Sequence, residues 1–130
     1  MLFRRGEYME NKYKLNTNQT VYDMNLNPGP FGSIRSGSKT VEMRLNDERR
    51  VGIEKGDLIR FTNVETGEIL LVRVLDKSVY PSFKELYDSY SKTSIGYKEN
   101  EDADPVDMLT YYSEESIAKY GALALEIELI

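Results

Sequence analysis

Hydrophobic and polar residues alternate most regularly over residues 40–45. The alternation divides this segment into two faces, with Val41, Met43 and Leu45 on the apolar one and Thr40, Glu42 and Arg44 on the polar one. Because successive side chains of a β-strand point to opposite sides, the segment predicts a strand with one buried and one polar face. Residues 46–50 follow it as a charged turn.

Four other segments have the composition of strands, and turn signals separate them. They are 21–26, 58–63, 69–76 and a final strand at 125–129. A tight turn over 54–57 precedes the second of these strands. A hairpin loop at 65–68, where Gly67 supplies a positive φ, joins the second to the third. Strands joined by hairpins favour an antiparallel or mixed sheet over a βαβ array.

Short helices are predicted between the strands from their caps and breakers. They cover 31–35 and 82–90, and two more begin at Asp104-Pro105 and at Ser113, the last ending at Gly121. The helix at 82–90 opens with a capping box, Ser82-x-x-Glu85. Five strands with covering helices predict an α+β fold, a small and partly open barrel over residues 21–130. Residues 1–20 are expected to form a flexible lead-in.

Composition limits the chemistry that this chain can perform. It has no cysteine and no histidine, which excludes disulfides, thiolate catalysis and the commonest zinc ligands. Any catalysis must therefore use Lys, Asp, Glu, Tyr, Ser or Thr, and any metal would be a hard cation held by carboxylates. We expect no cofactor and no metal. The longest aliphatic run, 69–72, is far short of the roughly 20 residues of a membrane span.

Charge is distributed unevenly along the chain. The net charge of −5 argues against electrostatic wrapping of nucleic acid. Residues 35–60 nevertheless carry seven Lys or Arg against five Asp or Glu, whereas residues 99–128 carry nine acids against Lys119 alone. A locally basic face can still attract an anion, because screening confines the interaction to about 10 Å. The alternative is two ordinary solvated faces.

Two features at the N-terminus lead to further expectations. No apolar stretch follows Arg4-Arg5, so we predict no secretory signal and a cytoplasmic protein. Codons for the Arg-Gly-Glu run before Met9 can spell a ribosome-binding sequence, so we hypothesise that Met9 is the natural start. An intact mass of the native protein that includes residues 1–8 would end this idea.

Several motifs resemble those of one known family. The segment from Pro30 to Arg44, PFGSIRSGSKTVEMR, resembles the signature of the ASCH domain, in which a short helix precedes G-x-K-T and a charged strand. The segments 53–61, 82–87 and 108–121 extend the likeness, which covers roughly residues 21–129. The resemblance implies a PUA-like barrel with a cleft between barrel and helices, and this cleft is proposed to bind RNA.

Some small members of this family are amidohydrolases that remove an acyl group from modified cytidine, and others are reported as ribonucleases. The amidohydrolase pattern has a Lys, a Thr shortly beyond it and a later carboxylate. Lys39 matches the Lys, Glu42 stands about where the Thr would lie with Thr40 beside it, and Asp107 aligns loosely with the carboxylate. The resemblance therefore implies a catalytic role for Lys39, and the candidate carboxylate for acid–base catalysis beside it is Glu42 or Asp107.

The polar face of the strand at 40–45 is the candidate binding surface. Thr40, Glu42 and Arg44 follow each other at roughly 6–7 Å, which suits contacts with one nucleotide. Arg44 suits a phosphate or a base edge, and Glu42 suits a base amino group or the role of general base. Lys39 suits phosphate binding or, when desolvated, a role as nucleophile or base. The alternative is a charge lattice on the surface, in which these side chains only form ion pairs with residues of neighbouring strands.

Aromatic residues are the remaining candidates. Tyr111 and Tyr112 are suited to stacking on a base, although the chain has ten tyrosines and most must lie at the edge of the core. Phe31 either forms a wall of the cleft or packs in the core. The turn Asn46-Asp47-Glu48 lacks the spacing of a calcium loop and is expected to be solvated.

Three functions remain open. The leading hypothesis is binding of RNA or a nucleotide through Lys39, Thr40, Glu42 and Arg44. The second is a hydrolase acting on a modified nucleoside, such as N4-acetylcytidine, or on RNA. The third is a protein-interaction module that uses the acidic region 99–115. We expect neither a membrane nor DNA as a partner.

Overall fold

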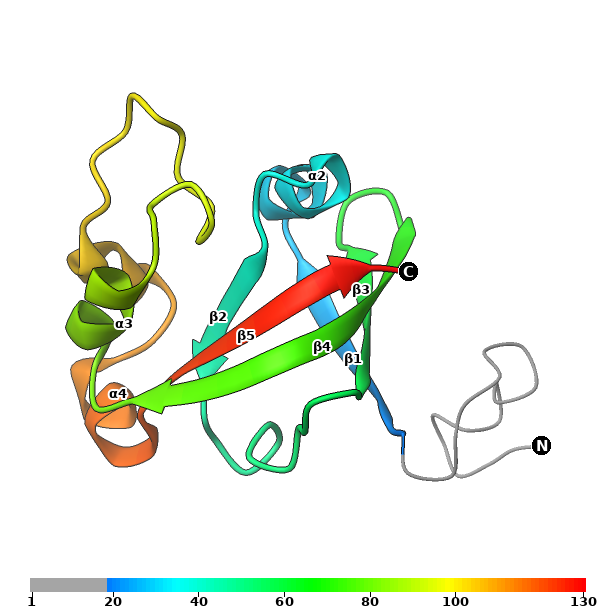
Figure 1. The fold of residues 1–130 in the computed structure, drawn as a ribbon. Helices are drawn as coiled ribbons and strands as arrows, with labels where there is room; N and C mark the ends of the chain where they lie inside the picture. Colours follow the sequence, from blue (N-terminus) through cyan, green and yellow to red (C-terminus); the bar gives the residue numbers. More distant parts are fainter. Residues whose placement is uncertain (1–18) are drawn as a thin grey trace.

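The computed structural model describes residues 19–130 (Figure 1). Almost all of the predicted lead-in over 1–20 lies outside the described residues, and so does Met9. None of the described helices is long and apolar enough to cross a membrane. The elements follow one another as β1 (Val21–Leu26), α2 (Pro28–Ser36), β2 (Val41–Leu45), β3 (Leu58–Asn63), β4 (Ile69–Tyr80), α3 (Phe83–Ser89), the 3₁₀ helix η2 (Pro105–Thr110), α4 (Glu114–Tyr120) and β5 (Ala122–Leu129).

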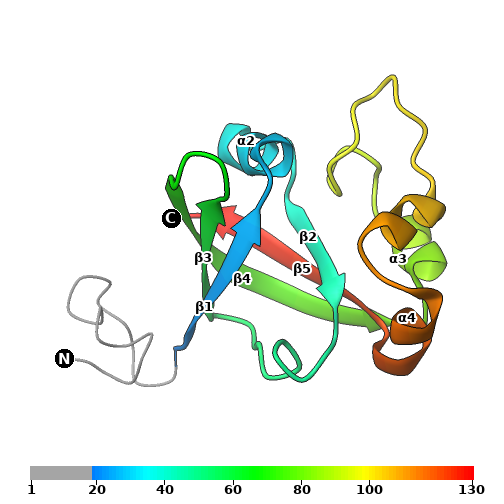
Figure 2. The same cartoon turned by 180° about the vertical axis from the view of Figure 1, so that it is seen from behind.

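The five strands form one mixed sheet in the order β1-β3-β4-β5-β2. β1 and β3 run parallel, and the other three neighbouring pairs are antiparallel. The sheet curls into a half-barrel, and α3 and α4 lie together beyond one end of β4 and β5 (Figures 1 and 2). The prediction of an α+β fold with a mixed five-stranded barrel is therefore confirmed.

Two strands are longer than predicted. β4 continues past Asp76 to Tyr80, and β5 begins at Ala122 instead of Leu125. A register shift between Val74 and Asp76 explains the first error, because a bulge breaks the alternation of apolar and polar residues on which the prediction rested. Beyond the bulge the two strands keep pairing as far as Tyr80 and Ala122.

The helix starts also differ from the sequence expectation. α2 begins at Pro28 and not at Phe31, because proline is tolerated in the first turn of a helix. It ends at Ser36, and Gly37 caps it with a left-handed φ of +91°. The capping box at Ser82 is not formed as predicted. Its side chain makes no hydrogen bond to the helix backbone and instead contacts the carboxylate of Glu85.

Two apolar clusters hold these elements together. The first fills the half-barrel and includes Phe31 and Phe61. The second packs Val41 of β2 and the start of β5 against Leu86 of α3 and Met108 of η2. This second cluster fixes η2 opposite β2, and the candidate site lies between them.

Candidate functional site

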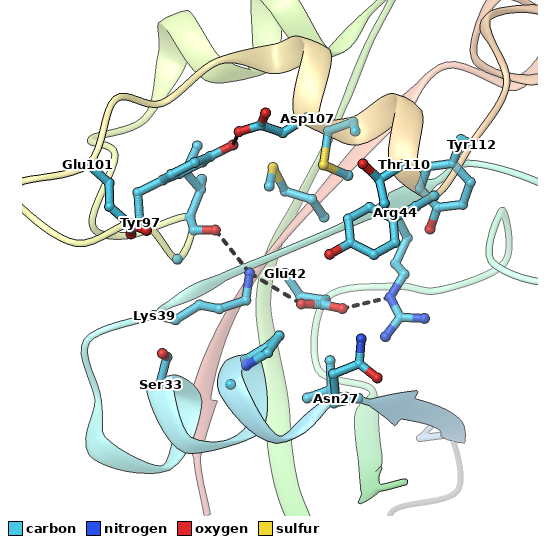
Figure 3. A pocket seen from close by; sticks show the side chains of 18 of the residues that line it. Asn27, Ser33, Lys39, Glu42, Arg44, Tyr97, Glu101, Asp107, Thr110 and Tyr112 are labelled. Atoms are coloured by element: carbon cyan, nitrogen blue, oxygen red, sulfur yellow. Dashed lines mark hydrogen bonds and ion pairs between the residues drawn. The ribbon is translucent and has the colours of Figure 1, made fainter.

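A cavity of about 730 Å³ opens between the barrel and the segment 95–112. Its walls come from the end of β1 and the start of α2, from β2, and from the loop and 3₁₀ helix that follow α3. Figure 3 shows Lys39, Glu42 and Arg44 on one side of this space, and Tyr97 and Asp107 across from them. The volume lies within the range of small-molecule sites in proteins.

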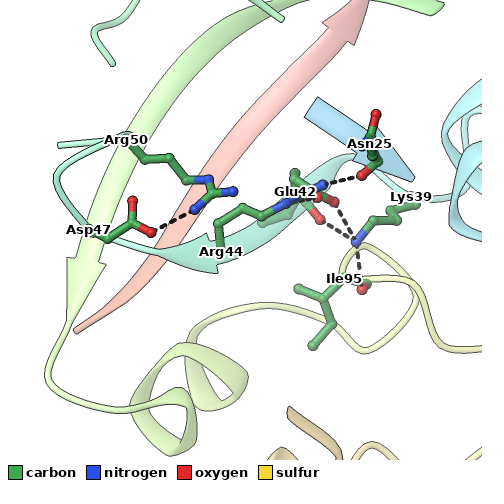
Figure 4. A network of polar contacts seen from close by, with 8 residues as sticks. Asn25, Lys39, Glu42, Arg44, Asp47, Arg50 and Ile95 are labelled. Carbon is green, nitrogen blue, oxygen red and sulfur yellow. Dashed lines mark hydrogen bonds and ion pairs between the residues drawn. The ribbon is translucent and has the colours of Figure 1, made fainter. Parts of the chain in front are cut away.

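Glu42 lies at the floor of the cavity and is only 4% exposed. Its Oε1 is 3.4 Å from Nζ of Lys39, and its Oε2 is 2.6 Å from Nε of Arg44 (Figure 4). Burial alone would raise the pKa of Glu42, but the two cations outweigh burial and hold the pKa below its usual value. The carboxylate is therefore ionised, and the alternative of a charge lattice on the surface is wrong for Glu42.

Lys39 is also buried, and each of its three ammonium protons has an acceptor. Its Nζ is 2.9 Å from the Val41 carbonyl oxygen, 3.1 Å from that of Ile95 and 3.4 Å from the Glu42 carboxylate. A lysine that donates in three directions is suited to orienting a carboxylate and not to nucleophilic attack. The contact with Ile95 also holds the loop after α3 against β2, where the backbone N–H groups of residues 40 and 41 donate to Ser94.

Arg44 joins the two edge strands of the sheet. In addition to its ion pair with Glu42, it donates from Nη2 to the Asn25 carbonyl oxygen of β1, at 2.8 Å. β1 and β2 stand at opposite ends of the strand order, so this contact helps to close the curled sheet. The side chain is 14% exposed and lines the cavity.

Tyr97 was not recognised in the sequence as a site residue. Its hydroxyl is 2.8 Å from Oδ2 of Asp107 and 2.8 Å from the hydroxyl of Tyr87, and all three residues line the cavity. Burial, followed by these two hydrogen bonds, raises the pKa of Tyr97 far above its usual value, so the hydroxyl keeps its proton. Nothing in the local pattern separates this tyrosine from the nine others, because its role depends on a residue ten positions away.

The two tyrosines predicted from sequence occupy different environments. Tyr112 packs its ring parallel to Phe83, with centroids 6.1 Å apart, and belongs partly to the core. Tyr111 lines the cavity but is 62% exposed. Its ring is therefore available to a ligand at the mouth.

The structure brings most of the predicted site residues around this one cavity. Lys39, Glu42, Arg44, Asp107, Tyr111 and Tyr112 all line it. Thr40 and Phe31 are not among the lining residues. Thr40 precedes the first residue of β2 and is exposed, with its backbone bound to Ser94 and Ile127. Phe31 is 1% exposed and lies in the barrel core.

Acidic residues outside the cavity floor mainly stabilise their own loops. Glu101 accepts from the backbone N–H of Lys98, and Asp104 accepts from that of Val106. In the predicted turn after β2, Asp47 pairs with Arg50. Within residues 19–130 no group of three or more acidic side chains is placed to hold a metal ion.

A curled mixed sheet with helices at one end and a cavity between them is the architecture of a PUA-like domain. The ASCH domain model matches residues 24–130, and the chain belongs to this family. No curated protein matches the chain.

Solved structures of similar proteins agree with this assignment. The crystal structure of the hypothetical protein PH0355 is 33% identical, with a TM-score of 0.73, and the match covers 85% of this chain and 100% of that one. The solution structure of PF0455 from Pyrococcus furiosus is 32% identical, with a TM-score of 0.64 and coverage of 85% and 98%. The crystal structure of protein EF3133 from Enterococcus faecalis is 13% identical, with a TM-score of 0.61, and the match covers 94% of this chain and 83% of that one. At this identity the likeness supports the fold alone.

Proposed function

We propose that the cavity binds one nucleotide, either free or as part of an RNA. The observation that carries this proposal is the ionised carboxylate of Glu42, held between Lys39 and Arg44 at the floor of a cavity that has tyrosines along its wall. Membership of the ASCH domain family suggests RNA binding or a related function. A cytoplasmic location is part of the same proposal.

The chemistry of the walls fits the parts of a nucleotide. The Glu42 carboxylate has lone pairs that can accept from a base amino group, and Arg44 has N–H groups that can donate to a base edge or a phosphate. Tyr111 offers a flat, exposed ring on which a base can stack. The cavity is large enough for one such ligand.

Removing the exposed ring at the mouth should weaken binding without unfolding the protein. Base stacking contributes about 1–3 kcal/mol, so Tyr111→Ala should raise the Kd for the best-binding nucleotide or short single-stranded RNA by roughly 5- to 150-fold. Calorimetric titration at low salt measures this change. Ile69→Ala removes another exposed apolar side chain, away from the cavity, and should leave the Kd unchanged. If no nucleoside, nucleotide or RNA binds the wild-type protein, the proposal fails.

Hydrolysis of a modified nucleoside is the second candidate, and the position of two carboxylates, Glu42 and Asp107, on the wall of one cavity favours it. A general base must first lie within reach of the proton that it removes, and a carboxylate that lines the cavity meets this requirement. The test is turnover of N4-acetylcytidine and of other acylated nucleosides, measured by mass. Product that disappears in both Glu42→Gln and Asp107→Asn would establish catalysis. An absence of product from the wild-type protein would end this candidate and leave the binding proposal standing.

A further inference from the structure

Tyr97 follows a glycine that lets its loop lie directly on Lys39. Gly96 has a φ of +114°, and a Cβ atom added to it would lie 3.3 Å from Cδ of Lys39. Glycine adopts this conformation without strain and leaves room for the lysine side chain. The Lys39 ammonium in turn donates to the carbonyl oxygen of Ile95. The loop is therefore held on the barrel by the residues directly before Tyr97, and both Gly96 and Tyr97 line the cavity.

The hydroxyl of Tyr97 is fixed from two sides. It donates to Oδ2 of Asp107 at 2.8 Å, with the carbonyl oxygen of Asp104 farther away at 3.4 Å, and it is 2.8 Å from the hydroxyl of Tyr87. Because the single proton of Tyr97 goes to the carboxylate, Tyr87 is the donor in the second bond. Tyr87 is 9% exposed and belongs to the second apolar cluster, so this chain of hydrogen bonds begins in the core. The Tyr97 hydroxyl has no proton left for a ligand, and what this residue offers to the cavity is its ring.

The ring of Tyr97 is held as well as its hydroxyl. It meets the ring of Tyr87 edge to face, with centroids 5.8 Å apart and an angle of 68° between the planes. Tyr97 is half-buried and packs partly against the second apolar cluster. Figure 3 shows it beside Asp107 and across the cavity from Glu42. A ring that has little freedom left to lose is suited to stacking, because binding then costs little conformational entropy.

We propose that the ring of Tyr97 is the inner stacking surface for the base of the nucleotide, and that Asp107 and Tyr87 are positioning residues that hold this ring. The proposal rests on the proposed function and deepens it, because it states where in the cavity the base lies. Asp107 then acts through Tyr97 and does not touch the ligand. Two consequences can be measured: the ligand must carry a base, and its affinity depends on a hydroxyl group that it does not contact.

The first experiment asks whether the base contacts Tyr97. The protein is titrated calorimetrically at low salt with the four ribonucleoside 5′-monophosphates, with ribose 5-phosphate and with short single-stranded RNA. Stacking of one base changes the Kd by roughly 5- to 150-fold, so at least one nucleotide should bind more tightly than ribose 5-phosphate by a factor in this range. Tyr97→Ala should raise the Kd for that nucleotide by a factor in the same range.

The outcomes of this titration separate the proposal from the function on which it rests. If nucleotides bind the wild-type protein and Tyr97→Ala equally well, the proposal is wrong and the proposed function stands. Equal Kd values for ribose 5-phosphate and the nucleotides in the wild-type protein also overturn the proposal. If the wild-type protein binds neither a nucleotide nor RNA, the proposed function fails and the proposal falls with it.

A second set of variants tests the hydrogen bond between Tyr97 and Asp107. Tyr97→Phe keeps the ring and removes the hydroxyl, and it should raise the nucleotide Kd by roughly 2- to 10-fold, the range that corresponds to one hydrogen bond. Asp107→Ala should have an effect of the same size. The double variant should bind no more weakly than either single variant, because both changes break the same contact. Asp107→Asn keeps an acceptor oxygen for Tyr97 and should restore most of the affinity.

Tyr120→Phe is the matched control for these variants. It also removes a tyrosine hydroxyl that donates to a carboxylate, that of Glu48, but neither residue lines the cavity, so the nucleotide Kd should not change. Urea unfolding establishes that each variant is folded under the conditions of the titration. If the effects of Tyr97→Phe and Asp107→Ala multiply in the double variant, Asp107 contacts the ligand by itself and the positioning role is wrong. The same conclusion follows if Asp107→Asn loses as much affinity as Asp107→Ala.

Discussion

Glu42→Gln is expected to lower the free energy of unfolding by about 3 kcal/mol or more. The substitution keeps the shape of the side chain but removes the one negative charge between Lys39 and Arg44. Both cations then stay in a largely buried environment without their counterion, and breaking a buried ion pair on one side costs about 3–5 kcal/mol. Urea unfolding of the wild-type and variant proteins at neutral pH measures the difference.

The same pair of proteins should differ in how their stability depends on pH. The pKa of Glu42 is lower in the folded state than its usual 4.5. The stability that its charge contributes is therefore fully present above about pH 4.5 and is lost as the pH falls toward the folded-state pKa. The difference in the free energy of unfolding between the wild-type protein and Glu42→Gln should therefore become smaller as the pH is lowered below about 4.5.

An exposed ion pair provides the control for the Glu42 substitution. Glu68 pairs with Arg35, and both side chains are about half exposed. Glu68→Gln should cost less than about 1 kcal/mol, because water screens such pairs. If Glu42→Gln is no more destabilising than Glu68→Gln, the buried network does not hold the site together as the distances indicate.

The candidate site could be predicted from sequence where its geometry is local. Glu42 and Arg44 are two positions apart on one strand, and alternation alone places them on the same face. The strands β1 and β3 were predicted with the bounds that the structure has, because a proline-rich turn and a glycine hairpin mark their ends.

What the sequence could not reveal depends on contacts between distant segments. Glu42 is buried because the loop that carries Ile95 covers the start of β2, and because Arg44 reaches across to Asn25 on the other edge strand. No local pattern encodes either contact. The same limit applies to Tyr97, whose partner Asp107 lies on a different element. Alternation also placed Thr40 on the ligand face, but the strand begins only at Val41.

Arg44→Gln should have the largest effect on ligand binding. Arg44 orients Glu42, contacts β1 and, in the proposed function, donates to a base edge or a phosphate, so one substitution removes a ligand contact and loosens the floor of the cavity. Truncating a buried, hydrogen-bonded charge in an interface costs about 2–5 kcal/mol, which corresponds to a rise of roughly 30-fold to several thousand-fold in the Kd for a nucleotide. Calorimetric titration of the folded variant measures this rise.

Arg44→Lys separates the charge of this residue from its geometry. Lysine keeps the positive charge beside Glu42 but has no planar fork of donors, so it should restore part of the stability and little of the affinity. The Kd should therefore stay within about tenfold of that of Arg44→Gln, and it should depend more on salt, because the remaining attraction is that of a point charge. A nucleotide Kd equal to that of the wild type in either variant would mean that the ligand does not reach the floor of the cavity, and the site would have to be sought nearer to Tyr111 at the mouth.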